Sequence, residues 1–170
     1  AWYQRCANAW AIDNPLQAAY LYAACKQQRA YNMIGLLIVT HETLGHAFSS
    51  LVSHFFGPCP DNVRLLNVAK DDTPELILTR ASALIHEVNQ GQGVLILTDI
   101  FGATPCNISR KLIQSDDVMM LTGLNAPMMV KAIQYSALRN DLNSLTQEVK
   151  EAALHGIMAL TYEPEEATRT

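Results

Sequence analysis

Two histidines, His41 and His46, lie in the segment "LLIVTHETLGH" (residues 36–46), where a run of apolar residues ends. The string "HETLGH" is close to the helix motif of zinc proteases, in which two histidines four residues apart bind one metal ion. His41 and His46 are five residues apart, so on a helix they would point roughly 140° away from each other. Their spacing argues against a zinc site, and we expect no metal and no other cofactor.

His41 is the first residue after a predicted strand, "IGLLIVT" (residues 34–40), and Asp99 ends another, "GVLILTD" (residues 93–99). If these strands are neighbours in one sheet, the two side chains face each other. The Asp99 carboxylate would then accept a hydrogen bond from one imidazole nitrogen, which fixes the tautomer and leaves the other nitrogen unprotonated. That nitrogen is a nucleophile that could attack phosphorus, and the carboxylate would stabilise the cationic ring that forms.

The segment "FGATPCN", which follows shortly after Asp99, adds groups that suit a phosphate. Gly102 and Ala103 are small, so the backbone can approach a ligand closely there. We expect Thr104 at the N-cap of a helix, with Pro105 in the first turn. The N-terminus of such a helix favours an anion, and the Thr104 hydroxyl can add a hydrogen bond.

Each of these features also has an ordinary structural explanation. A histidine at a strand end is often a solvated loop residue, and an aspartate there often belongs to a turn. Cys106 could be a reactive thiol at a helix N-terminus, but no base lies beside it in the sequence. We expect the remaining histidines to be structural helix residues: His46, His54, His86 and His155. The case for a site depends on several features meeting at one edge of one sheet.

The elements that must position these groups alternate between strand and helix patterns from Met33 onward. We predict strands at residues 34–40, 62–68, 93–99 and 117–123, and helical segments at residues 43–56, from Thr73 to before Gly91, from Thr104 to about Gln114, and from Ala126 to His155 with a break near Asn140. A last short strand, "GIMALTYE" (residues 156–163), is predicted to close the domain. This order predicts an α/β fold with a mostly parallel central sheet and helices on both faces. In such a sheet, ligands bind beyond the carboxyl ends of the strands.

The chain of 170 residues is long enough for one domain with a sizeable core. Its composition changes near residue 33: both tryptophans, for example, lie before that point. We treat residues 1–32 as an N-terminal appendage with a helix at residues 15–29, residues 33–160 as the domain, and residues 161–170 as a tail. The appendage could be a docking helix, or sequence upstream of a natural start at Met33.

Composition excludes several classes of protein. The formal charge is −4 and lysine and arginine do not cluster, so we expect no nucleic-acid partner. No apolar run approaches the ~20 residues of a membrane span, and the first residues do not form a signal peptide. The four cysteines form no C-x-x-C pair, which is typical of free thiols in a cytoplasmic protein.

From Met33 to about Leu160, the sequence resembles the enzyme IIA domain of the mannose-type phosphotransferase system. The resemblance is carried by "GLLIVTHETLGHAF", "GVLILTDIFGATPCN" and "VMMLTGLNAPMM", in the family's order and spacing. It implies that His41 is the phosphorylated histidine, that Asp99 orients it, and that the Thr104 hydroxyl helps to hold the phosphoryl group. It also implies a homodimer in which a C-terminal edge strand is exchanged.

The partners that the resemblance implies form a chain of phosphoryl transfer. The group would pass from phosphoenolpyruvate through enzyme I and phospho-HPr to His41, then to a IIB protein and to sugar, with peripheral contact to a membrane sugar permease. Two residues depart from the family pattern: Ala103 stands where a second glycine is common, and Cys106 where an aromatic residue is common. Neither change removes a catalytic group, but they leave the sugar open.

Other functions remain open at this point. On the same fold, a regulatory module could use the phosphorylation state of His41 to control docking to a target protein. The chain could also be the phosphoryl-donor subunit of a dihydroxyacetone kinase. A flavodoxin-like nucleotide-binding domain is disfavoured, because no glycine-rich phosphate loop follows the first strand. Neighbouring genes for IIB, IIC and IID proteins would favour transport.

Overall fold

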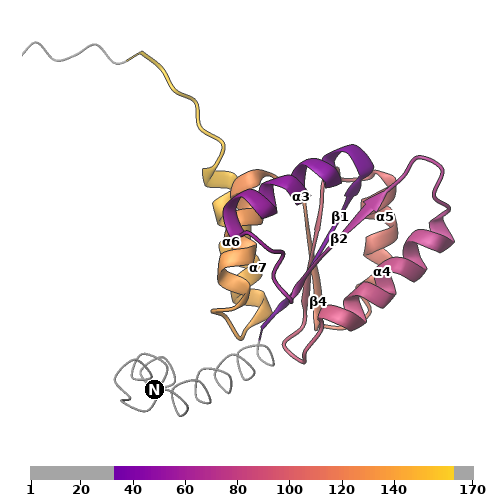
Figure 1. The fold of residues 1–170 in the computed structure, drawn as a ribbon. Helices are drawn as coiled ribbons and strands as arrows, with labels where there is room; N and C mark the ends of the chain where they lie inside the picture. The colour runs from indigo at the N-terminus through magenta and orange to yellow at the C-terminus, as the bar shows by residue number, and fades with distance from the viewer. Residues whose placement is uncertain (1–32, 163–170) are drawn as a thin grey trace, which may run out of the picture.

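The computed structural model describes residues 33–162, so the predicted N-terminal appendage and residues 163–170 lie outside the described part. A four-stranded parallel sheet forms its centre, with the strand order β2-β1-β3-β4 (Figure 1). The strands are β1 (Gly35–His41), β2 (Val63–Val68), β3 (Val94–Thr98) and β4 (Val118–Thr122). Each lies within two residues of its predicted bounds.

Helices cover both faces of this sheet, as Figure 1 shows. They are α3 (Glu42–Phe56), α4 (Pro74–Val88), α5 (Thr104–Ser109) with the 3-10 turn η2 (Arg110–Leu112), α6 (Ala126–Ser136) and α7 (Leu142–His155). Helices α3, α6 and α7 pack on one face, and α4 and α5 on the other. The predicted α/β class with a parallel sheet and helices on both faces is confirmed. No helix within residues 33–162 is long and apolar enough to cross a membrane.

The two central strands, β1 and β3, are buried on both faces. Leu36 and Ile38 of β1 enter the core under α3, α6 and α7, while Leu37 and Val39 enter the core under α4. Both faces therefore need apolar residues, which explains why these strands read as continuous apolar runs. Each fully buried side chain of this kind contributes about 1.5–3 kcal/mol relative to an exposed one.

The predicted cap at Thr104 is wrong by one residue. Ala103 is the N-cap of α5 and makes no side-chain cap bond. Its carbonyl accepts the first helical hydrogen bond, from the N–H of Asn107 at 2.9 Å, so Thr104 is already inside the helix. The α-helix also ends at Ser109 and continues only as the 3-10 turn η2, short of the predicted end near Gln114.

The predicted last strand is not a strand in a single copy of the chain. Residues 157–162 belong to no element and extend away from the domain after α7 (Figure 1). Four large apolar side chains in this stretch are between 74% and 88% exposed: Ile157, Met158, Leu160 and Tyr162. An apolar segment forms a strand only when another strand pairs with it, and the described sheet, whose edges are β2 and β4, does not include this segment. Pairing with a second copy stays a prediction.

Replacement of Gly35 by alanine should test how closely α4 lies on β1. An added Cβ would lie 2.7 Å from the carbonyl oxygen of Val88 and 2.8 Å from its Cγ2. Because Gly35 in β1 and Val88 at the end of α4 are both buried, neither can move aside easily. We therefore expect the free energy of unfolding to fall by about 1–3 kcal/mol. Urea denaturation measures this, with the exposed Ser50→Ala as the control. Wild-type stability for Gly35→Ala would show that α4 shifts freely.

Candidate active site

The carboxyl ends of β1 and β3 bring His41 and Asp99 together. The two strands are parallel neighbours, with Val39 paired to Thr98. His41 ends β1 and is also the N-cap of α3, while Asp99 follows β3 directly. Both residues therefore lie at the edge of the sheet where ligands bind in folds of this class.

The Asp99 carboxylate is held by three N–H groups. Its Oδ2 lies 2.7 Å from Nδ1 of the His41 ring and accepts the backbone N–H of the same residue at 2.8 Å. Its Oδ1 accepts the backbone N–H of Ile100 at 2.8 Å. The ionised carboxylate can only accept, so the ring proton sits on Nδ1 and Nε2 of the neutral ring is unprotonated. Since its ring bonds to Asp99, His41 does not cap α3 through its side chain.

The carboxylate is buried and the imidazole is not. The side chain of Asp99 is 3% exposed and that of His41 is 43% exposed. Burial is the largest single influence on the Asp99 carboxyl and by itself would raise its pKa. The hydrogen bonds from the backbone and ring of His41 and from Ile100 together outweigh burial, so the pKa of Asp99 is lowered from its usual value. Asp99 is therefore an anion at neutral pH.

The loop from Asp99 to α5 places the other predicted residues at the same edge. Gly102 has φ +81°, a conformation that favours glycine, and no atom lies close to where a Cβ would be. Ala103 donates its N–H to the carbonyl of Ile100 at 3.3 Å, which closes a turn. Thr104, the first residue of α5, is exposed. Since α5 packs against β1 and β3, this residue begins its helix beside the strands that carry the pair.

Two apolar residues at this edge were missed by sequence reasoning. Ile100 is 54% exposed and Phe101 is 73% exposed. The available signal was a pair of large apolar residues directly after a strand end, "DIFG", where a turn is expected to be polar. Exposed apolar surface beside a reactive group is a usual mark of a docking surface. Cys106, in contrast, is fully buried and presents no thiol to solvent.

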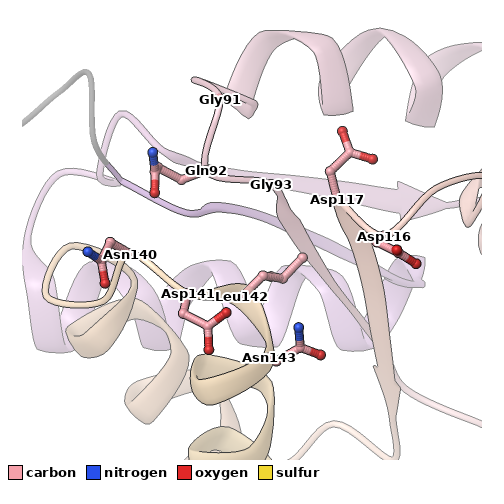
Figure 2. Close-up of a pocket in the computed structure, with 9 residues that line it drawn as sticks. All are labelled: Gly91, Gln92, Gly93, Asp116, Asp117, Asn140, Asp141, Leu142 and Asn143. Atoms are coloured by element: carbon pink, nitrogen blue, oxygen red, sulfur yellow. The ribbon is translucent and has the colours of Figure 1, made fainter.

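A pocket at the opposite end of the sheet is structural in character. Figure 2 shows its lining, which comes from the turns before β3 and β4 and from the start of α7. Two of its three aspartates make structural hydrogen bonds: Asp141 accepts the N–H of Ser144 at 2.9 Å, and Asp117 accepts from Ser115 and from Asn89 at the end of α4. Within residues 33–162, no group of three or more metal-binding side chains is placed to hold a metal ion.

The arrangement at the carboxyl edge is suited to covalent transfer through a histidine. An oriented ring offers an unprotonated nitrogen, and a buried anion on its other side balances the charge of a substituted ring. Small residues lie in the adjoining loop, and the exposed Thr104 begins the helix that follows it.

Comparisons with known proteins identify related sequences and structures. The family model described as "PTS system fructose IIA component" matches residues 35–150. Over 134 residues, the chain is 23% identical to the "PTS system mannose-specific EIIAB component" of Escherichia coli K12 and to that of Shigella flexneri. The match covers 78% of this chain but 41% of each relative, so the chain spans less than half of their length.

Solved structures are similar over most of the described domain. The phosphotransferase component EIIA from Streptococcus agalactiae is 26% identical with a TM-score of 0.66, covering 75% of this chain and 97% of that one. The mannose/sorbose specific IIA subunit from Enterococcus faecalis is 16% identical with a TM-score of 0.65, covering 79% and 99%, which shows a shared fold. Because the family model matches more than half of the chain, the protein belongs to the EIIA-man family, the family of PTS fructose IIA components.

Proposed function

We propose that this protein is a phosphocarrier of the phosphoenolpyruvate-dependent sugar phosphotransferase system. It accepts a phosphoryl group from phospho-HPr on Nε2 of His41 and passes it to a IIB protein. The observation that carries this proposal is the 2.7 Å contact between Nδ1 of His41 and the buried Oδ2 of Asp99. This contact commits one ring nitrogen and leaves the other as the nucleophile, on a ring that solvent reaches.

The transfer is a displacement at phosphorus. The lone pair of Nε2 forms a bond to phosphorus while the bond from phosphorus to the donor breaks, and the donor leaves with that electron pair. The His41 ring then carries the phosphoryl group on Nε2 and a proton on Nδ1, and is a cation. Asp99 balances this charge at hydrogen-bonding distance. The reverse displacement, by a group on the acceptor protein, returns the ring to its neutral state.

The loop after Asp99 supplies contacts for the phosphoryl group and for the protein partners. Gly102 and Ala103 keep the space beside the ring free of large side chains, and the exposed Thr104 hydroxyl donates to a phosphoryl oxygen. The exposed Ile100 and Phe101, which directly follow Asp99 in the chain, give a protein donor an apolar surface. The same surface serves the acceptor, since both partners must bring their own reacting group to His41.

Labelling should depend on His41 alone among the histidines. Incubation with radiolabelled phosphoenolpyruvate, enzyme I and HPr should give a phosphoprotein that is labile in acid and stable in alkali. His41→Ala should abolish the label, because it removes the nucleophile. His46→Ala is the matched control and should label as the wild type does. Full labelling of His41→Ala would refute the proposal.

Asp99→Asn should slow phosphoryl transfer by roughly 10²-fold or more, because an amide neither balances the ring's charge nor secures the Nδ1–H tautomer. Rapid-quench measurement of His41 phosphorylation gives the rate, and circular dichroism checks that the fold is kept. A rate equal to that of the wild type would show that Asp99 is only a turn residue.

The same variant should change the response to acid. A carboxyl group whose pKa is lowered in the folded state stabilises the fold above its unfolded pKa of about 3.9, and the stabilisation is lost as the pH falls through the lowered value. The wild type should therefore lose free energy of unfolding below about pH 4, and Asp99→Asn should lose less over that range. Identical acid profiles would contradict the lowered pKa.

We also propose a homodimer in which residues 157–162 pair with the sheet of a second copy. Strand β4 is one of the two edges of the described sheet, with β2 at the other, and a groove beside β4 is lined by Ile113, Met119, Met120 and Asn143, among others. The exposed apolar segment after α7 has the strand-like composition that such an edge accepts. Exchange of an identical segment satisfies both copies at once.

Truncation after His155 should weaken both dimerisation and stability, because it removes the segment that pairs with β4. Truncation after Tyr162 is the control, since it removes only residues 163–170 and leaves that segment in place. Sedimentation velocity at micromolar concentration measures the state of each protein. A full-length monomer would exclude the dimer, and an undiminished dimer after truncation at His155 would exclude the role of the segment.

A further inference from the structure

The side chain of Asn125 joins two helices near the candidate site. Its Oδ1 accepts the N–H of Met128 at 2.9 Å and caps the start of α6. Its Nδ2 donates to the carbonyl of Ala153 at 3.0 Å, in the last turn of α7. Both groups are among those that helix ends leave without a partner, and one amide serves both because it carries a donor and an acceptor.

The turn that leads to Asn125 is bonded to the end of β3. Gly123 donates its N–H to the carbonyl of Asp99 at 3.0 Å, and Leu124 donates to the carbonyl of Thr98 at 3.0 Å. Gly123 has φ +83°, which favours glycine at this point of the turn. The two residues before Asn125 therefore hold the backbone from which the Asp99 side chain projects.

The contact between the two helices at this point is close. A Cβ on Gly156 would lie 2.5 Å from Cγ of Pro127, so the end of α7 sits directly on the start of α6. A turn held between β3 and this helix pair has little room to move. Hydrogen bonds therefore tie Ala153 to Asn125, the backbone joins Asn125 to Gly123, and further hydrogen bonds tie Gly123 to Asp99 and Asp99 to His41.

We propose that Asn125 is a positioning residue for phosphoryl transfer. It fixes the turn after β4 between β3 and the two helices, so that the Asp99 carboxylate keeps its contact with Nδ1 of His41. Asn125 touches neither the phosphoryl group nor the ring, and acts only through Asp99. Its effect on the rate of transfer rests on the proposed phosphocarrier function, whereas its effect on the His41–Asp99 contact does not.

Two variants remove the bond from Asn125 to Ala153 and keep the bond that caps α6. Asn125→Ser keeps an oxygen that can cap α6 and removes the donor to Ala153. Asn125→Asp also keeps the cap, and places a carboxylate oxygen against the Ala153 carbonyl. Asp141→Ala is the control, because Asp141 caps α7 at the opposite end of the domain (Figure 2). The melting temperature of each variant is measured, so that the losses of stability in the three variants can be compared.

Two measurements then test the role of Asn125. At saturating phospho-HPr, Asn125→Ser and Asn125→Asp should phosphorylate His41 between about threefold and tenfold more slowly, since small misplacements of reacting groups have effects of at least this size. The KM for phospho-HPr should stay unchanged. In proton NMR, the downfield signal of the His41 Nδ1 proton should shift or broaden in both variants. Asp141→Ala should change neither readout.

The outcomes are distinct. A wild-type rate and an unchanged Nδ1 signal in both Asn125 variants would overturn the inference. So would equal losses in Asp141→Ala at the same loss of melting temperature, which would indicate general loosening. If wild-type protein is not labelled at all, the phosphocarrier proposal fails, and the NMR comparison alone decides the role of Asn125. If Asn125→Ser does not fold, Asn125→Asp gives the same comparison.

Discussion

The buried carboxylate of Asp99 is the group on which the structure at the carboxyl ends of β1 and β3 depends. An ionised carboxylate with a side chain only 3% exposed has lost most of its hydration, which costs several kcal/mol unless other groups replace the water. Three N–H groups do so, and two of them belong to His41. The fold therefore cannot place Asp99 without also placing the imidazole, and the orientation of the ring follows from the need to satisfy a buried charge.

This requirement constrains the elements on both sides. Because β1 and β3 are parallel, their carboxyl ends lie at the same end of the sheet. The register of the pairing sets the distance between His41 and Asp99, which lie at those ends. A slip of one residue would reverse the faces of the strand and break the contact. Helix α3 must also begin close to the sheet, and Gly45 allows this, since a Cβ there would clash with the side chain of Asn67 in β2 and lie 2.9 Å from Oγ1 of Thr40. Glycine in the second turn of α3 thus belongs to the support of His41.

The sequence predicted the strands from local patterns, and it predicted the His41–Asp99 contact on the condition that their two strands are neighbours. An apolar run between turn residues marks a buried strand, and in a parallel sheet the residues after neighbouring strands must meet. The cap of α5 was misplaced because Thr-Pro fits both the N-cap and the first turn, and backbone conformation decides between them. Asn125 could not be assigned its role, since its second partner, Ala153, is 28 residues away. The exposure of residues 157–162 was not predicted either, because the sequence does not show which strand of a sheet would pair with this segment.

The two ends of the sheet differ in how a local change spreads. At the amino end, Asp141 bonds within its own turn, and Asp117 bonds to Ser115 and to Asn89 after α4, so none of these bonds involves a residue at the carboxyl end. At the carboxyl end, the bonds join β3, the turn after β4 and the ends of α6 and α7. The segment proposed to pair with a second copy leaves the domain from this same end, directly after Gly156. In such a dimer, the paired segment would pull on the end of α7, which Asn125 joins to the turn beside Asp99. Assembly and the orientation of His41 would then depend on the same few hydrogen bonds.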